Sequence, residues 1–173
     1  MVKILIKCSV FLVFILLINS GCSSSDELAT PEVIGSKIRS KVISGAEAFE
    51  AINKLHGLAV AADKNTIAEY GTEENRDLLY ISSYGNADTA YHSFKKMMEK
   101  MAHSKDGPFF HLMPLPPNKD KLFFTLGLGA AHYVFVSRNY IIWYQTYQST
   151  GMDLPQSLTD LYPLEQSAVI DED

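Results

Sequence analysis

Cysteine is scarce in this chain: only two occur among 173 residues, and both lie within the first 22 positions. Beyond Cys22 the sequence therefore offers no pair for a disulfide bond and no cysteine nucleophile for catalysis. Such a chain has no thiols to mispair in an oxidising compartment. These absences exclude a disulfide scaffold and a cysteine-dependent enzyme as descriptions of the region that follows Cys22.

Basic charge is also sparse, and it is not gathered into a stripe. The chain has 15 Lys and Arg residues against 20 Asp and Glu residues, a formal net charge of −5. Lys3 and Lys7 lie in the N-terminal leader, and without them the net charge is −7. A nucleic-acid-binding domain usually carries a basic face, so we expect no nucleic-acid partner. An anionic membrane surface is likewise an unfavourable partner for the domain itself.

Motifs for catalysis and cofactor binding are lacking as well. The sequence contains no Gly-x-Ser-x-Gly elbow, phosphate-binding loop, zinc-finger spacing or haem-attachment motif. Gly127 and Gly129 begin a dinucleotide-type pattern, but residues 132–136 predict a strand where that motif requires a helix. These glycines instead predict a bulge or a tight hairpin. We therefore expect a non-enzymatic domain, with a hydrolase as a weaker alternative.

The N-terminus has the layout of an export signal. Two lysines precede an uncharged, largely apolar run of eleven residues, 8–18, and small or polar residues at 19–21 lead to Cys22. The apolar run is shorter than the ~20 residues that a membrane-spanning helix needs. We predict that residues 1–21 are a signal peptide.

The tripeptide 20–22 (Ser-Gly-Cys) resembles the end of the lipobox of bacterial lipoproteins. In that family the cysteine thiol is acylated and the cysteine becomes the new N-terminus, so the resemblance implies a membrane anchor on Cys22. Ser23, in place of Asp after the cysteine, implies a periplasm-facing location at the outer membrane. Asn19 departs from the aliphatic residue that the family prefers, which leaves cleavage without a lipid as the alternative. The resemblance covers only residues 1–25.

The remaining sequence predicts a polar tether at 22–32 and one α+β domain at 33–173, which resembles no characterised family. Helical spacing of apolar residues predicts a helix from the capping box at 44–47 to a stop at Gly57. A second helix is predicted from a cap at Asn86 or Asp88, and Gly107-Pro108 ends it. Alternation predicts strands at 66–70, 77–84, 121–128, 132–137 and 140–147, with a short helix near 155–161. Four prolines make 108–117 a loop or extended connector, and 33–43 is either an edge strand or a short turn of helix. We expect an antiparallel sheet with two helices packed on one face, ferredoxin-like in arrangement.

Three histidines are candidate metal ligands. His56 follows the first helix, His111 lies in the proline-rich connector, and His132 opens a strand. If they converge, three imidazoles suit zinc or copper, and a haem is a further alternative. No ligand spacing supports convergence, and scattered structural histidines are the simpler explanation.

The last strand is aromatic on both sides of its alternation. Trp143 and Tyr147 share one side, and Tyr140 and Tyr144 share the other. A half-solvated strand alternates with polar residues, so either the same chain covers both faces or one face binds a ligand, a second copy or another envelope protein. These four residues are the candidate interaction surface. The sequence thus predicts a lipid-anchored envelope domain acting as a binding or assembly module, or alternatively a periplasmic metal- or haem-binding protein.

Overall fold

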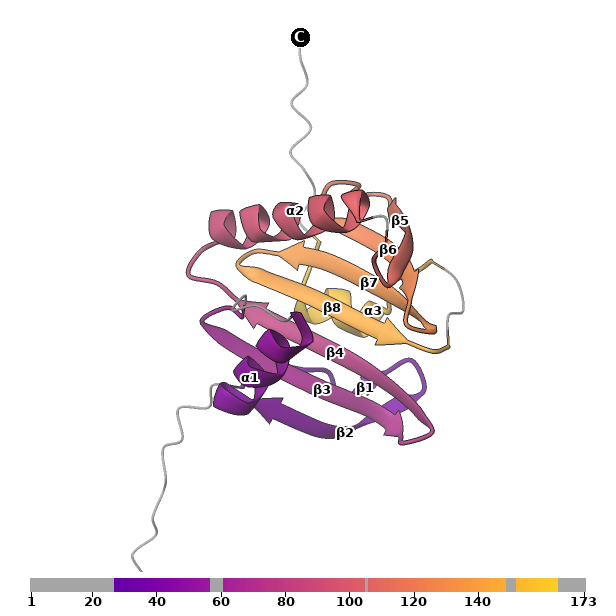
Figure 1. The fold of residues 1–173 in the computed structure, drawn as a ribbon. Helices are drawn as coiled ribbons and strands as arrows, with labels where there is room; N and C mark the ends of the chain where they lie inside the picture. The colour runs from indigo at the N-terminus through magenta and orange to yellow at the C-terminus, as the bar shows by residue number, and fades with distance from the viewer. Residues whose placement is uncertain (1–26, 57–60, 105, 149–151, 165–173) are drawn as a thin grey trace, which may run out of the picture.

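An eight-stranded antiparallel sheet organises the described part of the chain, which in this computed structural model comprises residues 27–56, 61–104, 106–148 and 152–164. The strand order is β1-β2-β3-β4-β8-β7-β6-β5, and the sheet curls around a core (Figure 1). The elements in chain order are β1 (Val33–Ile34), β2 (Lys37–Ser44), α1 (Gly45–His56), β3 (Lys64–Thr72), β4 (Asn75–Ser83), α2 (Ala87–His103), β5 (Phe109–Pro114), β6 (Leu122–Gly127), β7 (Ala130–Ser137), β8 (Tyr140–Thr146) and α3 (Gln156–Leu161).

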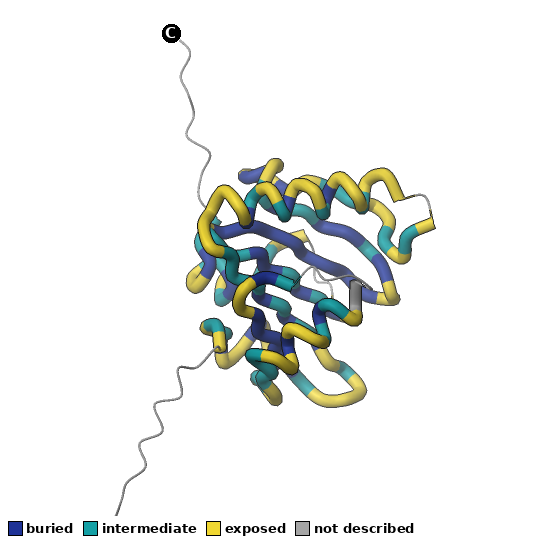
Figure 2. Tube along the Cα trace, turned by 60° about the vertical axis from the view of Figure 1, so that its left-hand side comes forward, coloured by how far each residue is buried: buried dark blue, intermediate teal, exposed yellow. Residues whose placement is uncertain are grey.

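Helices α1 and α2 cover one face of the sheet (Figure 1). The apolar stripe of α2 repeats at every fourth position and packs on β7 and β8, while α1 packs on β3. The contacting core residues of this face are Ala90, Phe94, Met98, Val134, Val136 and Ile141 under α2, and Ala48, Ile52 and Ile67 under α1. Figure 2 shows exposed residues along the outer side of these helices and buried ones along the central strands.

The opposite face encloses the larger core. Aromatic and aliphatic side chains from β3, β4, β6, β7 and β8 meet there, and Leu158 of α3 and Tyr162 close over them. Every residue of β7 is buried, because this strand is covered on both faces. The continuous apolar character of β7 and β8 is thus explained largely by burial within the chain.

The predicted α+β class with an antiparallel sheet is confirmed. The ferredoxin-like arrangement is not confirmed, because the sheet has eight strands and a third helix lies on the face opposite α1 and α2. Residues 33–43, left open between strand and helix, form β1 and part of β2, joined by a turn in which Gly35 takes a positive φ of 59°.

The interpretation of 108–117 as a connector is wrong for residues 109–114, which form the edge strand β5. Prolines are tolerated there because an edge strand need not donate on its outer side. The register with β6 shifts between Phe110 and Met113, and His111 at this bulge has a φ of 56°. The tight hairpin expected near Gly129 is confirmed between β6 and β7, with φ 50° at Leu128 and 76° at Gly129.

Candidate functional site

The candidate metal ligands lie in different settings. The side chain of His56 is outside the described residues, as is Cys22, the predicted site of lipidation. His111 is exposed at the bulge of β5, whereas His132 is 1% exposed within β7. Among the described residues, no group of three or more His, Cys, Asp or Glu side chains is placed to hold a metal ion. The metal or haem alternative therefore stays a prediction from sequence.

Both ring nitrogens of His132 are engaged by its neighbours. Its Nε2 lies 2.9 Å from the carbonyl oxygen of Gly127, and its Nδ1 lies 2.9 Å from the indole Nε1 of Trp143. Because a carbonyl only accepts and an indole N–H only donates, Nε2 carries the proton and Nδ1 accepts. The ring of Phe109 packs edge-on at a centroid distance of 5.1 Å. Any ligand to His132 must first displace one of these two hydrogen bonds.

Protonation of His132 is expected to destabilise the fold. Burial lowers its pKa below the ordinary value of 6.5, and the hydrogen bond to Gly127 opposes this shift. The unfolded chain therefore takes up this proton at a higher pH than the folded protein does. The stabilisation is complete above about pH 6.5 and is lost as the pH falls through the lower folded-state pKa. Urea unfolding should show a smaller free energy at about pH 5.5 than at about pH 7.5.

Two variants separate this effect from the titration of surface groups. His132→Gln should flatten the pH dependence over this interval, whereas His92→Gln, at an exposed position of α2, should preserve it. Stability that rises as the pH falls would contradict the buried neutral imidazole.

The four aromatic residues proposed as an interaction surface are distributed over both faces. Tyr144 is buried, and Tyr140 packs edge-on against Tyr162 at a centroid distance of 5.2 Å. On the other face Trp143 is half-buried, with the ring of Phe109 at 5.3 Å. Tyr147, just beyond β8, is 54% exposed. Of the four, only Tyr147 presents most of its side chain to solvent.

A buried polar cluster is the main feature that sequence reasoning missed. Asp77 Oδ1 accepts from Lys37 Nζ at 2.6 Å and from the Tyr147 backbone N–H at 3.3 Å. Its Oδ2 accepts from the Tyr144 hydroxyl at 2.7 Å, and Lys37 Nζ also donates to Asn75 Oδ1 at 2.8 Å. Burial, together with the hydrogen bond and charge of Asp77, raises the pKa of Tyr144, so this phenol stays a donor. These hydrogen bonds connect β2, β4 and β8, and the charged and hydroxyl groups of the cluster find their partners within it.

The segment 28–31, called here the N-terminal strap, is hydrogen-bonded to the enclosed face. Four successive residues are each held by a side chain: Leu28 N–H donates to Thr66 Oγ1 (2.7 Å), Tyr162 donates to Ala29 O (2.7 Å), Arg39 to Thr30 O (2.8 Å) and Tyr70 to Pro31 O (2.8 Å). The strap therefore belongs to the folded domain, although composition assigns residues 22–32 to a tether.

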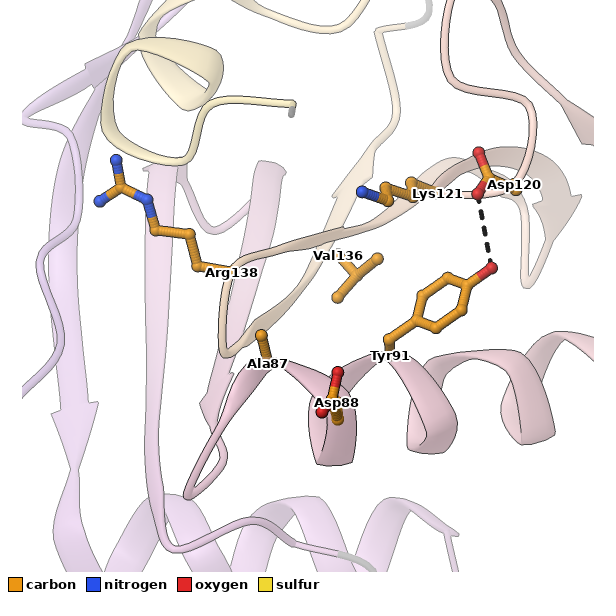
Figure 3. Close-up of a pocket in the computed structure, with 7 residues that line it drawn as sticks. All are labelled: Ala87, Asp88, Tyr91, Asp120, Lys121, Val136 and Arg138. Carbon is orange, nitrogen blue, oxygen red and sulfur yellow. Dashed lines mark hydrogen bonds between the residues drawn. The ribbon is translucent and has the colours of Figure 1, made fainter. Parts of the chain in front are cut away.

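A charged pocket lies between the first turns of α2, the β5–β6 connection and the β7–β8 turn (Figure 3). Its volume is about 400 Å³. Seven residues line it and define what we call the α2 pocket: Ala87, Asp88, Tyr91, Asp120, Lys121, Val136 and Arg138. Val136 is buried and forms its apolar floor, while two carboxylates and two cations surround it.

Local structure explains how these side chains are placed. Asn86 caps α2 by accepting from Thr89 N at 2.8 Å, which sets the first turn that carries Asp88. The hydroxyl of Tyr91 donates to Asp120 Oδ2 at 3.4 Å and so links α2 to the β5–β6 connection. Burial, followed by the charge and hydrogen bond of Asp120, raises the pKa of Tyr91, which stays a neutral donor.

Comparison with protein-family models, curated proteins and solved structures finds no match. The geometry of the chain is thus the basis for any functional argument. Within the described residues, no helix combines the length and apolar character needed to cross a bilayer. Sequence reasoning missed the α2 pocket because its residues come from three separate segments, and only the strand order brings them together.

Proposed function

We propose that this protein is a lipid-anchored lipoprotein of the cell envelope whose folded domain is a non-enzymatic binding module. Acyl chains on Cys22 hold it in a membrane, with the periplasmic side of an outer membrane as the favoured location. The α2 pocket is the binding site, because it gathers four charged side chains around an apolar floor. The observation that carries the proposal is the short distance along the chain between Cys22 and the strap.

The strap supports this proposal because few residues separate it from the proposed anchor at Cys22. Leu28 N is bonded to Thr66, so six peptide units separate Cys22 from a fixed point of the fold. Their greatest reach is about 20 Å. An acylated Cys22 would therefore hold the folded domain close to the membrane surface, because the tether between them is short.

The α2 pocket lies at the end of the sheet from which the strap leaves. Thr66 pairs with Ser44 and Ile81 near the start of β3, and the β4 end is tied to the β7–β8 turn by a 2.9 Å bond from Tyr84 N to Asn139 O. We call this the Thr66 end of the sheet. In the strand order β3 and β7 are three strand spacings apart, about 14 Å. Anchoring through Cys22 thus directs the pocket toward the membrane.

Substitution of Cys22 tests the anchor directly. Cys22→Ala should abolish incorporation of labelled palmitate in the native host and move the protein from the membrane fraction to the soluble fraction. Cys8→Ala is the matched control, since it removes the other cysteine and should leave labelling unchanged. Mass spectrometry that finds the initiator Met1 retained and Cys22 unmodified would overturn the proposal.

A further inference from the structure

We propose that a second site, at the end of β8, binds a glycan built of N-acetylated hexose rings. A hollow of about 210 Å³ is present there, and its lining defines what we call the Tyr147 site: Glu73, Glu74, Arg76, Leu78, Gln145 and Tyr147. The chemistry of this site does not depend on the proposed function. Only the source of the ligand, the glycan of the cell wall, rests on the envelope location proposed above.

Strand pairing places the Tyr147 site on the face of the sheet that carries α1 and α2. Leu78 of β4 pairs with Gln145 of β8, and alternation directs both away from the enclosed core that takes up Leu79 and Tyr144. Figure 1 shows the β3–β4 turn and the end of β8 on the side of the sheet away from α1. Side chains of two central strands therefore reach solvent at this end.

The ring of Tyr147 is exposed to solvent but fixed in position. Its backbone N–H donates to the buried Asp77 Oδ1 at 3.3 Å, and its hydroxyl accepts from Gln145 Nε2 at 3.1 Å. The side chain is nevertheless 54% exposed. A fixed aromatic ring offers an apolar surface to the C–H groups of a sugar ring, and little conformational freedom is lost when the sugar binds.

Gln145 and Leu78 favour a sugar that carries an acetamido group. One N–H of the Gln145 amide is used by Tyr147, which leaves the other N–H and the carbonyl oxygen. These two groups match the C=O and N–H of a secondary amide. The half-buried Leu78 lies opposite Gln145 in the strand pair and offers apolar contact to the acetyl methyl group. A plain hexose has a hydroxyl at that place and makes neither interaction.

The charges of the site favour a neutral ligand over an ion. Arg76 is already paired with Glu69 at 3.0 Å, so an anion gains little from it. Glu73 and Glu74 are exposed, and solvent screens their charges. These carboxylates and the guanidinium still accept and donate hydrogen bonds. They are therefore suited to hydroxyl groups, which act as both donors and acceptors.

Strand order and size favour a glycan over a peptide. β4 and β8 each have a partner strand on both sides, so this face has no free strand edge to which a peptide could add. The hollow is also smaller than the about 300–1,000 Å³ of sites that enclose drug-sized ligands. A shallow site for one ring at a time fits a polymer, because its repeated units bind several tethered copies of the protein together.

The Tyr147 site lies at the opposite end of the sheet from the tether. The strap is bonded to Thr66, and the β3–β4 turn begins six residues further along β3, at Thr72. This separation corresponds to about 20 Å of strand. In the envelope location proposed above, an anchor at Cys22 turns this end away from the membrane and toward the cell wall.

Titration with a soluble oligosaccharide tests the chemistry of the site. The full chain, in micelles of a polyoxyethylene detergent, is titrated with the β-linked tetramer of N-acetylglucosamine and followed by amide NMR. We expect saturable shifts at Gln145 and Tyr147, with affinity for the β-linked glucose tetramer weaker by about tenfold, since the acetamido hydrogen bonds are lost. Equal affinity for the two tetramers, or no shift at these residues, would overturn the proposal.

Variants of two exposed aromatic residues provide the matched comparison. Tyr147→Ala should weaken binding of the N-acetylglucosamine tetramer by about tenfold, because the stacking surface is lost. Phe110→Ala removes an aromatic ring that is 56% exposed on β5 and does not line the hollow, so it should leave affinity unchanged. Both positions are on the surface, and thermal unfolding should be nearly the same. Equal losses of affinity would place the glycan elsewhere.

Gln145→Ala tests the selectivity for the acetamido group. This variant should bind the glucose tetramer and the N-acetylglucosamine tetramer with nearly equal affinity, because the amide that distinguishes them is absent. A merely structural role of Gln145 would lower both affinities by the same factor. Retention of the tenfold preference in this variant would show that Gln145 does not contact the acetamido group.

Sedimentation with purified peptidoglycan distinguishes the cell wall from a free oligosaccharide. The full chain should sediment with peptidoglycan, and Tyr147→Ala should remain in the supernatant. Binding of the tetramer without sedimentation would reject the wall as the source, and binding of a lysine-rich peptide in place of the tetramer would reassign the site to a protein partner. Tetramer binding by a protein whose Cys22 carries no lipid would disprove the anchor alone, whereas an acylated protein that binds no tetramer would disprove only this inference.

Discussion

Replacing Asp77 with Asn is expected to destabilise the protein by about 3–5 kcal/mol, the range for breaking a buried ion pair by removing one partner. Asp77 is 2% exposed and Lys37 is 8% exposed, and their charged atoms lie 2.6 Å apart. The substitution leaves the Lys37 ammonium buried without a countercharge. It also weakens the acceptor of the Tyr144 hydroxyl. Urea unfolding followed by fluorescence of Trp143, the only tryptophan, measures the loss.

An exposed ion pair in the same sheet gives the control. Arg76 and Glu69 lie 3.0 Å apart, with side-chain exposures of 45% and 17%. Glu69→Gln should therefore cost less than about 1 kcal/mol, because solvent screens the pair. If Asp77→Asn costs no more than Glu69→Gln, the buried cluster does not hold β2 to β4 and β8.

The two buried partners should be strongly non-additive. Lys37→Met leaves Asp77 with the Tyr144 hydroxyl and the Tyr147 N–H, so one charge remains partly satisfied. The double variant Lys37→Met, Asp77→Asn removes both charges and should cost less than the sum of the single variants. Strict additivity would mean that the two groups act independently.

The spacing of apolar residues predicts most of the helices and strands, because this pattern depends only on residues that are close in sequence. The helical stripe around Phe94 and the alternation in β4 each indicate which face of an element is buried. The strand β5 was missed because prolines oppose regular pairing, whereas an edge position and a bulge at His111 accommodate them. Which strand lies at the edge depends on the order of strands in the whole sheet, so the local sequence does not predict it.

The candidate site was less accessible to sequence reasoning for the same reason. Asp88 and Tyr91 lie one helical turn apart, but Asp120, Lys121 and Arg138 reach them only through the pairing of β6, β7 and β8. Histidine and aromatic residues attract attention by type, yet His132 and Tyr144 are occupied by hydrogen bonds inside the core. The charged residues of the α2 pocket belong to common types in turns and a first helical turn, so nothing in the sequence distinguishes them as site residues.

Removing the Phe94 ring is expected to cost about 3–5 kcal/mol, the range for a fully buried aromatic side chain replaced by Ala. Phe94 is 0% exposed, and its ring centroid lies 5.8 Å from that of Phe123. It packs in the same cluster as Val136, which floors the α2 pocket. The cavity left by Phe94→Ala should loosen α2 on the sheet and thereby displace Tyr91 and Asp88.

The same substitution on the other helix separates packing from loss of aromatic surface. Phe49 of α1 is 44% exposed, so Phe49→Ala should cost less than Phe94→Ala and leave the residues of the α2 pocket in place. Phe94→Ala should lower the urea midpoint and also shift the amide NMR signals of Asp88 and Tyr91, which line the α2 pocket. Because this ring packs α2 on the sheet and α2 supplies three of the seven lining residues, stability and the geometry of the pocket should change together. Lower stability with unchanged amide signals of Asp88 and Tyr91 would show that the pocket does not depend on how α2 packs on the sheet.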